Sequence, residues 1–336
     1  MGMKQRQECL RNDNRPLSVD IYCLVYNHGK YLRKALDGML MQRTDFPVRI
    51  IIHDDASTDD SVNIIMEYKS KYPDKIIAVI EDTNLYQNGK SIWKKMSPYF
   101  TGKYIATCEG DDFWIDTNKL KKQIEYLESH LDYSACYHNI LPVDAEGQYK
   151  EELRGMYTHV EEGDYTEEEI RHFNLKTQTA SLVRRNYNPW LTDEDKEVYF
   201  STKCNGDEIQ LVVCSSYGKI HILSDVMAAH RRVLNEGISW TALQNKKSEK
   251  ERFIASQKGY IELCRLFKHF HGKKIYPYNH ILSERLKYYI KSKSDKTNLS
   301  LEDRKDIREN IKIPFYAYIL FIPIFLWGRI KHVMKK

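Results

Sequence analysis

Glycine-rich phosphate-binding motifs are missing from this sequence. Neither a GxGxxG nor a Walker A sequence follows the first predicted strand, so the usual dinucleotide-binding and P-loop sites are excluded. The seven cysteines contain no CxxC pair, which argues against a zinc site and a disulfide framework and favours a reducing compartment. The polar N-terminus lacks the apolar core of a signal peptide. Repeats and low-complexity tracts are also lacking, so the 336 residues are expected to fold as a globular chain.

Acidic residues are scarce in the last third of the chain. Residues 241–336 carry 22 Lys and Arg against 9 Asp and Glu, whereas the first 240 residues carry 30 against 38. An acidic front does not suit a nucleic-acid groove, so we expect no nucleic acid to bind there. The basic rear could face anionic lipid, RNA or an acidic protein. The two parts are therefore expected to have different partners.

Short apolar runs alternate with helical patterns in the first half of the chain. Runs rich in Val, Ile and Tyr predict strands at 17–27, 48–55, 76–81, 104–109 and 134–140. The segments between them have apolar residues at helical spacing. This alternation predicts an α/β fold with a parallel sheet covered by helices on both faces. After residue 150 the pattern loosens, and residues 241–312 are basic and helical in pattern.

Polar side chains lie at the ends of three predicted strands. They are Tyr26 and Asn27 after the first strand, Asp54 and Asp55 after the second, and Glu109, Asp111 and Asp112 after the fourth. In open parallel sheets ligands bind beyond the carboxyl ends of the strands, so these side chains are expected to border one crevice. Adjacent carboxylates such as Asp111 and Asp112 repel each other unless a cation lies between them, and Mn²⁺ or Mg²⁺ takes such oxygen ligands. A solvated turn that caps the next helix is the alternative interpretation.

Three segments, in order, resemble the front half of the family 2 glycosyltransferases. They are VDIYCLVYNHGKYLRKALDGMLMQ, IIIHDDASTDDS and YIATCEGDDFWIDTNKL, which together extend over about 130 residues. The resemblance implies a Rossmann-like GT-A fold, with a mixed sheet, helices on both faces and a helical C-terminal region. It also implies a UDP-linked or other nucleotide-activated sugar as donor, and inversion at the anomeric centre. Farther along, RR, GDEIQL and MAAHRRVLNEGIS are similar to a branch that builds bacterial surface polysaccharides.

The resemblance implies that the nucleotide-sugar donor binds along these strand ends. Tyr26 would stack on the nucleobase with Asn27 beside it, and a core tyrosine at a strand end is the alternative. Asp55 would accept a hydrogen bond from the ring N–H of the base, with a helix cap as the alternative. Asn84 and Lys90, in NLYQNGK, would lie near the diphosphate. For Lys90 taken alone, a solvated loop is the alternative.

The resemblance further implies a Mn²⁺ or Mg²⁺ site. Asp112 would be a direct ligand, and Asp111 would contact the ribose or the metal. His230 could complete the site, although a lone histidine can equally be structural. Glu109 stands two residues before Asp111, where the family often has Asp, and its role stays open. Arg231 could meet the diphosphate, with a surface salt bridge as the alternative.

An inverting transfer needs one base that takes the proton of the acceptor hydroxyl. Asp207, in NGDEIQ, corresponds best to the family's base, and the adjacent Glu208 is the runner-up. Capping of the following helix is the alternative for both. Gln178, Thr179 and Trp114 are candidates for the acceptor pocket, with core packing as the alternative for Trp114.

We expect four regions along the chain. They are a polar N-terminal extension (1–16), the catalytic domain (17–240), a basic helical region (241–312) and an apolar and basic tail (313–336). The tail begins with 16 uncharged residues, which as a helix would reach about 24 Å, short of the roughly 30 Å hydrocarbon core. We expect this tail to associate with the inner face of the plasma membrane as a monotopic or re-entrant anchor, so that the protein is cytoplasmic and peripheral. A C-terminal helix packed on the protein is the alternative.

The expected function is metal-assisted transfer of a hexosyl or N-acetylhexosaminyl group in the synthesis of capsule, O-antigen or exopolysaccharide. The acceptor would be a glycan or a lipid-linked saccharide. A nucleotidyltransferase acting on sugar phosphates also combines an α/β sheet with metal-binding aspartates. It would usually have a glycine-rich, basic loop after the first strand, which YNHGKYL is not. A non-catalytic module that binds carbohydrate or membrane is the third interpretation.

Overall fold

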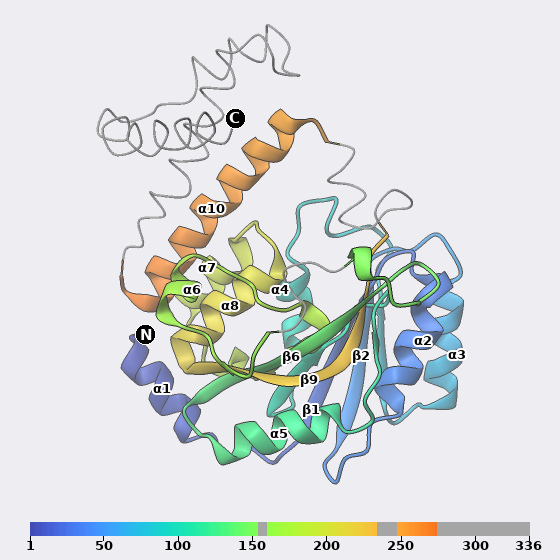
Figure 1. Ribbon diagram of the computed structural model, residues 1–336, viewed down its shortest axis with the longest axis horizontal. Helices are drawn as coiled ribbons and strands as arrows, with labels where there is room; N and C mark the ends of the chain where they lie inside the picture. Colours follow the sequence, from blue (N-terminus) through green and yellow to red (C-terminus); the bar gives the residue numbers. More distant parts are fainter. Residues whose placement is uncertain (154–159, 234–246, 274–336) are drawn as a thin grey trace, which may run out of the picture.

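The computed structural model describes residues 1–153, 160–233 and 247–273. The expected membrane tail (313–336) and most of the basic region (241–312) lie outside the described residues. The described part contains a nine-stranded sheet in the order β3-β2-β1-β4-β8-β6-β9-β5, with β7 paired to β9, and helices on both of its faces (Figure 1). This architecture confirms the expected α/β fold with a mixed sheet.

The first half of the sheet is parallel. It consists of β1 (Val19–Val25), β2 (Val48–Asp54), β3 (Ile76–Ile80) and β4 (Tyr104–Thr107). β1 pairs with β2 and with β4, and β2 pairs with β3. The four strands lie within the predicted apolar runs, which are typical of strands covered on both faces. Parallel pairing brings their carboxyl ends to the same edge of the sheet.

The second half of the sheet is mixed. Its strands are β5 (Phe113–Trp114), β6 (Tyr133–Val143), β7 (Gly163–Asp164), β8 (Val183–Arg185) and β9 (Lys219–Arg231). β8 is antiparallel to both β4 and β6, β6 and β9 are parallel, and β5 is antiparallel to β9. The alternation of strands and helices alone predicted a sheet with parallel strands, and this prediction is wrong for the second half of the sheet, where β8 is antiparallel to its neighbours. With three residues, β8 is too short to be recognised as a strand from the periodicity of the sequence. The end of β9 lies beside β5. In the chain, β5 directly follows residues 109–112, which contain Glu109, Asp111 and Asp112 and are called the acidic loop below.

Separate hydrophobic clusters lie on the two faces of the sheet. On one face Leu36, Ile64 and Ile124 pack against it from α2 (Gly29–Leu40), α3 (Ser61–Lys71) and α5 (Lys119–Ser129). Ile52 of β2 belongs to this cluster, whereas its neighbour Ile51 belongs to a different cluster with Met96 of α4 (Ile92–Met96), as expected where side chains alternate along a strand. The other face is covered by α4, α6 (Glu167–Arg171), α7 (Asp193–Ser201) and α8 (Gly206–Tyr217) (Figure 1). Four short 3₁₀ turns complete the description: η1 (Ser97–Tyr99), η2 (Glu151–Leu153), η3 (Thr179–Ser181) and η4 (Asn188–Trp190).

The first and last described helices lie against the same side of the domain. Helix α1 (Met3–Arg11), in the segment expected to be a polar extension, packs against α8. Arg6 of α1 is fully buried, and its guanidinium donates to both carboxylate oxygens of Asp195 in α7, at 2.6 and 3.2 Å. Helix α10 (Glu249–His271) packs against α7 and α8, and His269 lies 2.7 Å from the same carboxylate. The Asp195 side chain therefore joins α1, α7 and α10.

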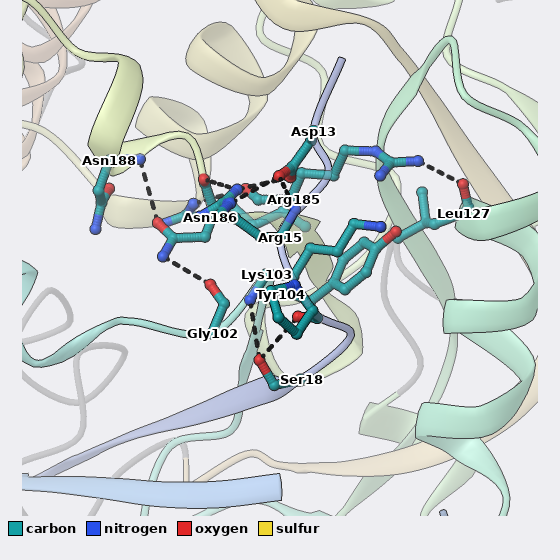
Figure 2. A network of polar contacts seen from close by, with 12 residues as sticks. Asp13, Arg15, Ser18, Gly102, Lys103, Tyr104, Leu127, Arg185, Asn186 and Asn188 are labelled. Carbon is teal, nitrogen blue, oxygen red and sulfur yellow. Dashed lines mark hydrogen bonds and ion pairs between the residues drawn. The ribbon is translucent and has the colours of Figure 1, made fainter. Parts of the chain in front are cut away.

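A polar network connects the chain between α1 and β1 to the segment just before β4 (Figure 2). This segment lies at the edge of the sheet opposite the carboxyl ends of the parallel strands. Asn186, just after β8, donates to the carbonyl oxygens of Phe100 and Gly102 at 3.1 and 2.9 Å. Arg15 donates to the carbonyl of Asn186 at 2.7 Å and pairs with Asp13. These contacts lie far from the carboxyl ends of the strands, so we assign them to stability.

All seven cysteines are free. Among the described residues, no helix has both the length and the apolar character needed to cross a membrane.

Candidate active site

The ends of β1 and β2 are held together by side-chain hydrogen bonds. Asn27 has a positive φ of 55°, its N–H donates to the Ser57 hydroxyl at 2.8 Å, and its side-chain oxygen accepts the Thr58 N–H at 2.7 Å. Asp54 accepts both the N–H and the hydroxyl of Ser57. Asn27 therefore fixes the turn after β1 to the segment after β2, and the αL conformation is one that Asn adopts more readily than most residues.

Asp55 holds the loop of residues 84–87 against the end of β2. Its buried carboxylate accepts the N–H of Leu85 at 2.6 Å and that of Tyr86 at 3.1 Å. Asn84 donates to the Asp55 carbonyl at 3.0 Å. Each carboxylate oxygen already accepts one N–H, so a base N–H would share an oxygen that has a second lone pair.

Tyr26 and Lys90 both have hydrogen bonds to the segment of residues 85–87. The partly exposed Tyr26 hydroxyl accepts a hydrogen bond from the Gln87 side chain at 3.4 Å, which ties the ring to the loop. Lys90 is exposed, and its backbone N–H donates to the Leu85 carbonyl at 2.9 Å. The structure thus brings Tyr26, Asp55 and the loop together, and leaves the Lys90 ammonium in solvent.

Three carboxylates gather in the loop after β4. One oxygen from each of Glu109, Asp111 and Asp112 lies within 4.8 Å of the others. Burial raises the pKa of Glu109 well above its ordinary value, and the charges of Asp111 and Asp112 add to the shift. Burial also raises the pKa of Asp111, although His28 and His230 oppose it. Mutually repelling oxygens of this kind fit a hard divalent cation such as Mn²⁺ or Mg²⁺.

His230, near the end of β9, faces the most buried of these carboxylates. Its Nδ1 lies 3.2 Å from both carboxylate oxygens of Asp112, and the N–H of Arg231 donates to one of them at 2.8 Å. Burial alone would lower the pKa of His230, but the charge and hydrogen bond of Asp112 raise it above the ordinary value. With Nδ1 committed to Asp112, Nε2 is the ring nitrogen left for a metal.

Arg231 fastens the acidic loop to the neighbouring turn. Its guanidinium donates to the carbonyls of Asp111, Asp144 and Ala145, at 2.9, 2.9 and 2.6 Å. The guanidinium carbon also lies 4.2 Å from the ring centre of Tyr31. The expected contact between Arg231 and a diphosphate would have to compete with these carbonyls.

Asp207 lies in the first turn of α8. Its Oδ1 accepts a hydrogen bond of 2.6 Å from the Thr179 hydroxyl. Burial raises the pKa of Asp207 above its ordinary value, the Thr179 hydrogen bond and His230 oppose that shift, and Asp112 adds to it. Through Thr179, whose carbonyl accepts the Thr107 hydroxyl at 2.6 Å, Asp207 is linked to the end of β4. In Glu208, burial and the charge of Asp207 raise the pKa to about 7.

The three expected acceptor residues surround turn η3. Trp114 is buried, and its indole N–H donates to the Ala180 carbonyl at 2.9 Å, so it takes the core position that was its alternative. Gln178 is also buried, and its side-chain oxygen accepts the Ala180 N–H at 2.8 Å. Only Thr179 directs a polar group at a site residue, namely Asp207.

Two contributors were missed at the level of sequence. His28, next to Asn27, places Nε2 3.8 Å from a carboxylate oxygen of Asp111. Thr107, the last residue of β4, donates to the Thr179 carbonyl at 2.6 Å. His28 directly follows the predicted strand end at residue 27, so a search one residue beyond each strand end would have found it. Thr107 lies inside the strand predicted at 104–109, where no such signal marks it.

The fold is similar to solved structures of the Staphylococcus aureus protein TarS. The structure in complex with UDP-GlcNAc aligns with a TM-score of 0.53 and 18% identity, over 87% of this chain and 70% of that chain. The complex with UDP aligns with a TM-score of 0.50 and 17% identity, over 76% of this chain and 70% of that one. At such identity the likeness shows the fold alone, and the fold is that of the GT-A glycosyltransferases.

The sequence comparison assigns the family. Residues 20–188, half of the chain, match the family described as "Glycosyl transferase family 2". The chain therefore belongs to glycosyl transferase family 2, as its three segments indicated.

Curated relatives match over less than half of the chain. An uncharacterized protein of Mycobacterium tuberculosis is 40% identical over 129 residues, which are 38% of this chain and 37% of that protein. An uncharacterized glycosyltransferase of Nostoc sp. is 28% identical over 128 residues, 38% of each chain. The chain thus spans little more than a third of the length of these relatives.

Proposed function

We propose that this protein transfers a sugar, with inversion, from a nucleotide-sugar donor to an acceptor hydroxyl. The observation that carries the proposal is the hydrogen-bonded link from Asp207 through Thr179 to Thr107 at the end of β4, the strand that leads into the carboxylates of Glu109, Asp111 and Asp112. A donor diphosphate fits on the side of the acidic loop and an acceptor on the side of α8. Family membership favours this activity over a nucleotidyltransferase and over a non-catalytic module.

The donor site would lie along the ends of β1 and β2. Tyr26 offers an aromatic face for the base, and Asp55 offers oxygens with a remaining lone pair. Asn84 and Lys90 belong to the loop that Asp55 holds in place. We propose UDP as the nucleotide, because the similar TarS fold is seen in complex with UDP-GlcNAc and with UDP. A hexosyl or N-acetylhexosaminyl group would then be transferred.

The divalent cation would be held by Asp112 and His230, with Asp111 and Glu109 beside them. When bound, Mn²⁺ or Mg²⁺ supplies Lewis-acid neutralisation of charge on the diphosphate. Asp112 also orients His230 through its Nδ1, and Arg231 fixes the loop that carries Asp111. These residues therefore bind and orient the donor.

Asp207 would act as the base. Its carboxylate takes the proton of the acceptor O–H while the acceptor oxygen forms a bond to the anomeric carbon. The bond from that carbon to the diphosphate oxygen breaks, and the nucleoside diphosphate leaves with the electron pair. Attack from the side opposite the leaving group inverts the anomeric centre. Glu208, next in the chain, is the alternative base.

The acceptor and the cellular role rest on the resemblance of the rear motifs. We propose a glycan or lipid-linked saccharide as acceptor, in the synthesis of a surface polysaccharide at the cytoplasmic face of the membrane. The tail expected to contact that membrane, residues 313–336, lies outside the described residues. Deleting it and measuring the membrane-bound fraction in cells tests this part alone: an unchanged fraction would contradict it.

The activity is tested with a panel of nucleotide sugars. We expect thermal stabilisation of the protein by one UDP-sugar in the presence of Mn²⁺, and release of UDP from that sugar. Neither stabilisation nor release with any UDP-, GDP- or dTDP-sugar would contradict the proposal.

A further inference from the structure

Turn η3 (Thr179–Ser181) is fixed by side chains from three different elements. Its three successive carbonyls accept the Thr107 hydroxyl of β4 at 2.6 Å, the Trp114 indole N–H of β5 at 2.9 Å and the Gln123 amide of α5 at 2.9 Å. A backbone in which each carbonyl has its own donor from a different element cannot shift without breaking one of these bonds. The turn is therefore a fixed point between the two halves of the sheet.

The donors that hold the turn are themselves buried. Thr107 is 3% exposed, Trp114 is 2% exposed and Gln123 is fully buried. Trp114 is in turn confined by Gly38 of α2, because a Cβ at residue 38 would lie 2.8 Å from the Trp114 carbonyl oxygen. Buried polar groups that are fully hydrogen-bonded specify one arrangement. The turn thus belongs to the rigid part of the fold.

The side chains of the turn point in two directions. The Ser181 hydroxyl stays inside, where it donates to the Gln178 carbonyl at 2.6 Å and meets the Thr177 hydroxyl at 2.9 Å. The partly buried Thr179 hydroxyl instead donates to Oδ1 of Asp207 at 2.6 Å. Asp207 stands on α8, and this bond connects its carboxylate to the strand ends that carry the acidic loop.

We propose that Thr179 is a positioning residue for Asp207, and that it aims one carboxylate oxygen at the acceptor hydroxyl by holding the other. This inference rests on the function proposed above. The hydroxyl proton of Thr179 is committed to Oδ1, which leaves Oδ2 to accept the proton of the attacking hydroxyl. Because the turn is tied to β4, whose end carries Glu109, the hydrogen bond also fixes the base relative to the donor side of the crevice. A carboxylate that rotates freely would reach the correct orientation only part of the time.

A direct role of Thr179 in binding the acceptor is the competing explanation. It predicts that loss of the hydroxyl raises the KM for the acceptor. Hydrolysis of the donor distinguishes acceptor binding by Thr179 from positioning of Asp207. In hydrolysis, water replaces the acceptor, so the reaction needs the base but no acceptor pocket. The conservative variant also helps, since Thr179→Ser keeps the hydroxyl and Thr179→Val keeps the shape.

The experiment compares UDP release by the full-length protein and its variants in Mn²⁺, with the UDP-sugar that stabilises the wild type. We expect Thr179→Val to lower kcat about 10- to 100-fold, with the donor KM and the Mn²⁺-dependent affinity for UDP unchanged. Thr179→Ser should lie nearer to the wild type than to Thr179→Val. Thr202→Val is the matched control, because the Thr202 hydroxyl donates only to the Val198 carbonyl of its own helix at 2.7 Å, and it should leave kcat unchanged.

The possible failures can be told apart. A Thr179→Val variant that turns over at the wild-type rate would overturn the inference alone. Equal losses in Thr179→Val and Thr179→Ser, together with a lower melting temperature, would overturn it in favour of a structural role. A wild-type protein that releases no nucleotide from any nucleotide sugar would overturn the proposed function and, with it, this inference.

Discussion

His230 lies 3.2 Å through its Nδ1 from both carboxylate oxygens of Asp112, although 118 residues separate the two in the chain. The contact joins the end of β9 to the loop after β4, and the N–H of Arg231 reinforces it. It places one imidazole nitrogen beside a cluster of three carboxylates. This pair is the centre of the proposed metal site.

Replacing Asp112 by alanine should abolish Mn²⁺-dependent binding of UDP and retain the fold. The carboxylate is the buried member of the acidic cluster, so its loss removes a ligand and the partner of His230. Titration calorimetry of UDP with and without Mn²⁺ measures the effect. Asp193→Ala, at an exposed position of α7, is the control and should bind as the wild type does. Unchanged UDP affinity in Asp112→Ala would rule out the metal role.

Affinity for Mn²⁺ should fall as the pH falls through the titration of His230. The pKa of His230 is raised, so the protonated form, which cannot ligate a metal, persists to a higher pH than in a free histidine. His230→Gln should bind Mn²⁺ more weakly, by about 10- to 100-fold, and with a shallower pH dependence near neutrality. Mn²⁺ binding followed by electron paramagnetic resonance measures both. In His221→Gln, a control on the same strand, the wild-type pH dependence should remain.

Asp207→Asn should keep donor binding and lose transfer by about 10²- to 10⁴-fold, the contribution expected of a general base. The pKa of Asp207 is raised, so its carboxylate takes up a proton at a higher pH than an ordinary carboxylate does. As the pH falls, the activity of the wild type should therefore begin to decline at that higher pH. Glu208→Gln is the companion variant and should retain most of the activity. The reverse result, a silent Asp207→Asn and an inactive Glu208→Gln, would move the base to Glu208, whose pKa of about 7 also suits that task.

Arg6→Met should destabilise the domain by about 3 to 5 kcal/mol, because it leaves the Asp195 carboxylate buried without its main cation. Burial would raise the pKa of Asp195, but Arg6, the Thr192 N–H and His269 hold it at about 2. A depressed carboxylate pKa stabilises the fold above the ordinary value near 4, and this stabilisation is lost as the pH falls towards 2.

Urea unfolding from pH 7 to pH 2 measures this prediction. The free energy of unfolding of the wild type should drop at the acid end, and the drop should be smaller in Arg6→Met. Arg11→Met, at an exposed position of the same helix, is the control. Equal stability of Arg6→Met and the control would show that α1 does not contribute to the domain.

Much of the site follows from strand ends that are visible in the sequence. The runs before Asn27, Asp55 and Glu109 form parallel neighbours, so the polar residues after them must meet at one edge. The acidic cluster follows directly, because its members lie within four residues. Such local features could be predicted since they depend only on periodicity and on the geometry of a parallel sheet.

The sequence could not show which hydrogen-bond partner each polar side-chain atom has. The hydroxyl of Thr179 meets Asp207 only because β8 turns back antiparallel to β4, a reversal too short to leave a periodic signal. Arg231 has the residue type of a phosphate ligand, yet its Nη1 donates to the carbonyls of the turn at residues 144–145 and its Nε to the carbonyl of Asp111. Both assignments depend on contacts between residues far apart in the chain.

The most direct test of the account is UDP release from a UDP-sugar in the presence of Mn²⁺, measured side by side for the wild type, Asp112→Ala and Asp207→Asn. We predict release by the wild type, none by Asp112→Ala because the donor no longer binds, and release slowed by about 10²- to 10⁴-fold in Asp207→Asn although UDP still binds. Release by Asp112→Ala and Asp207→Asn at the wild-type rate would contradict the assignment of this crevice as the active site.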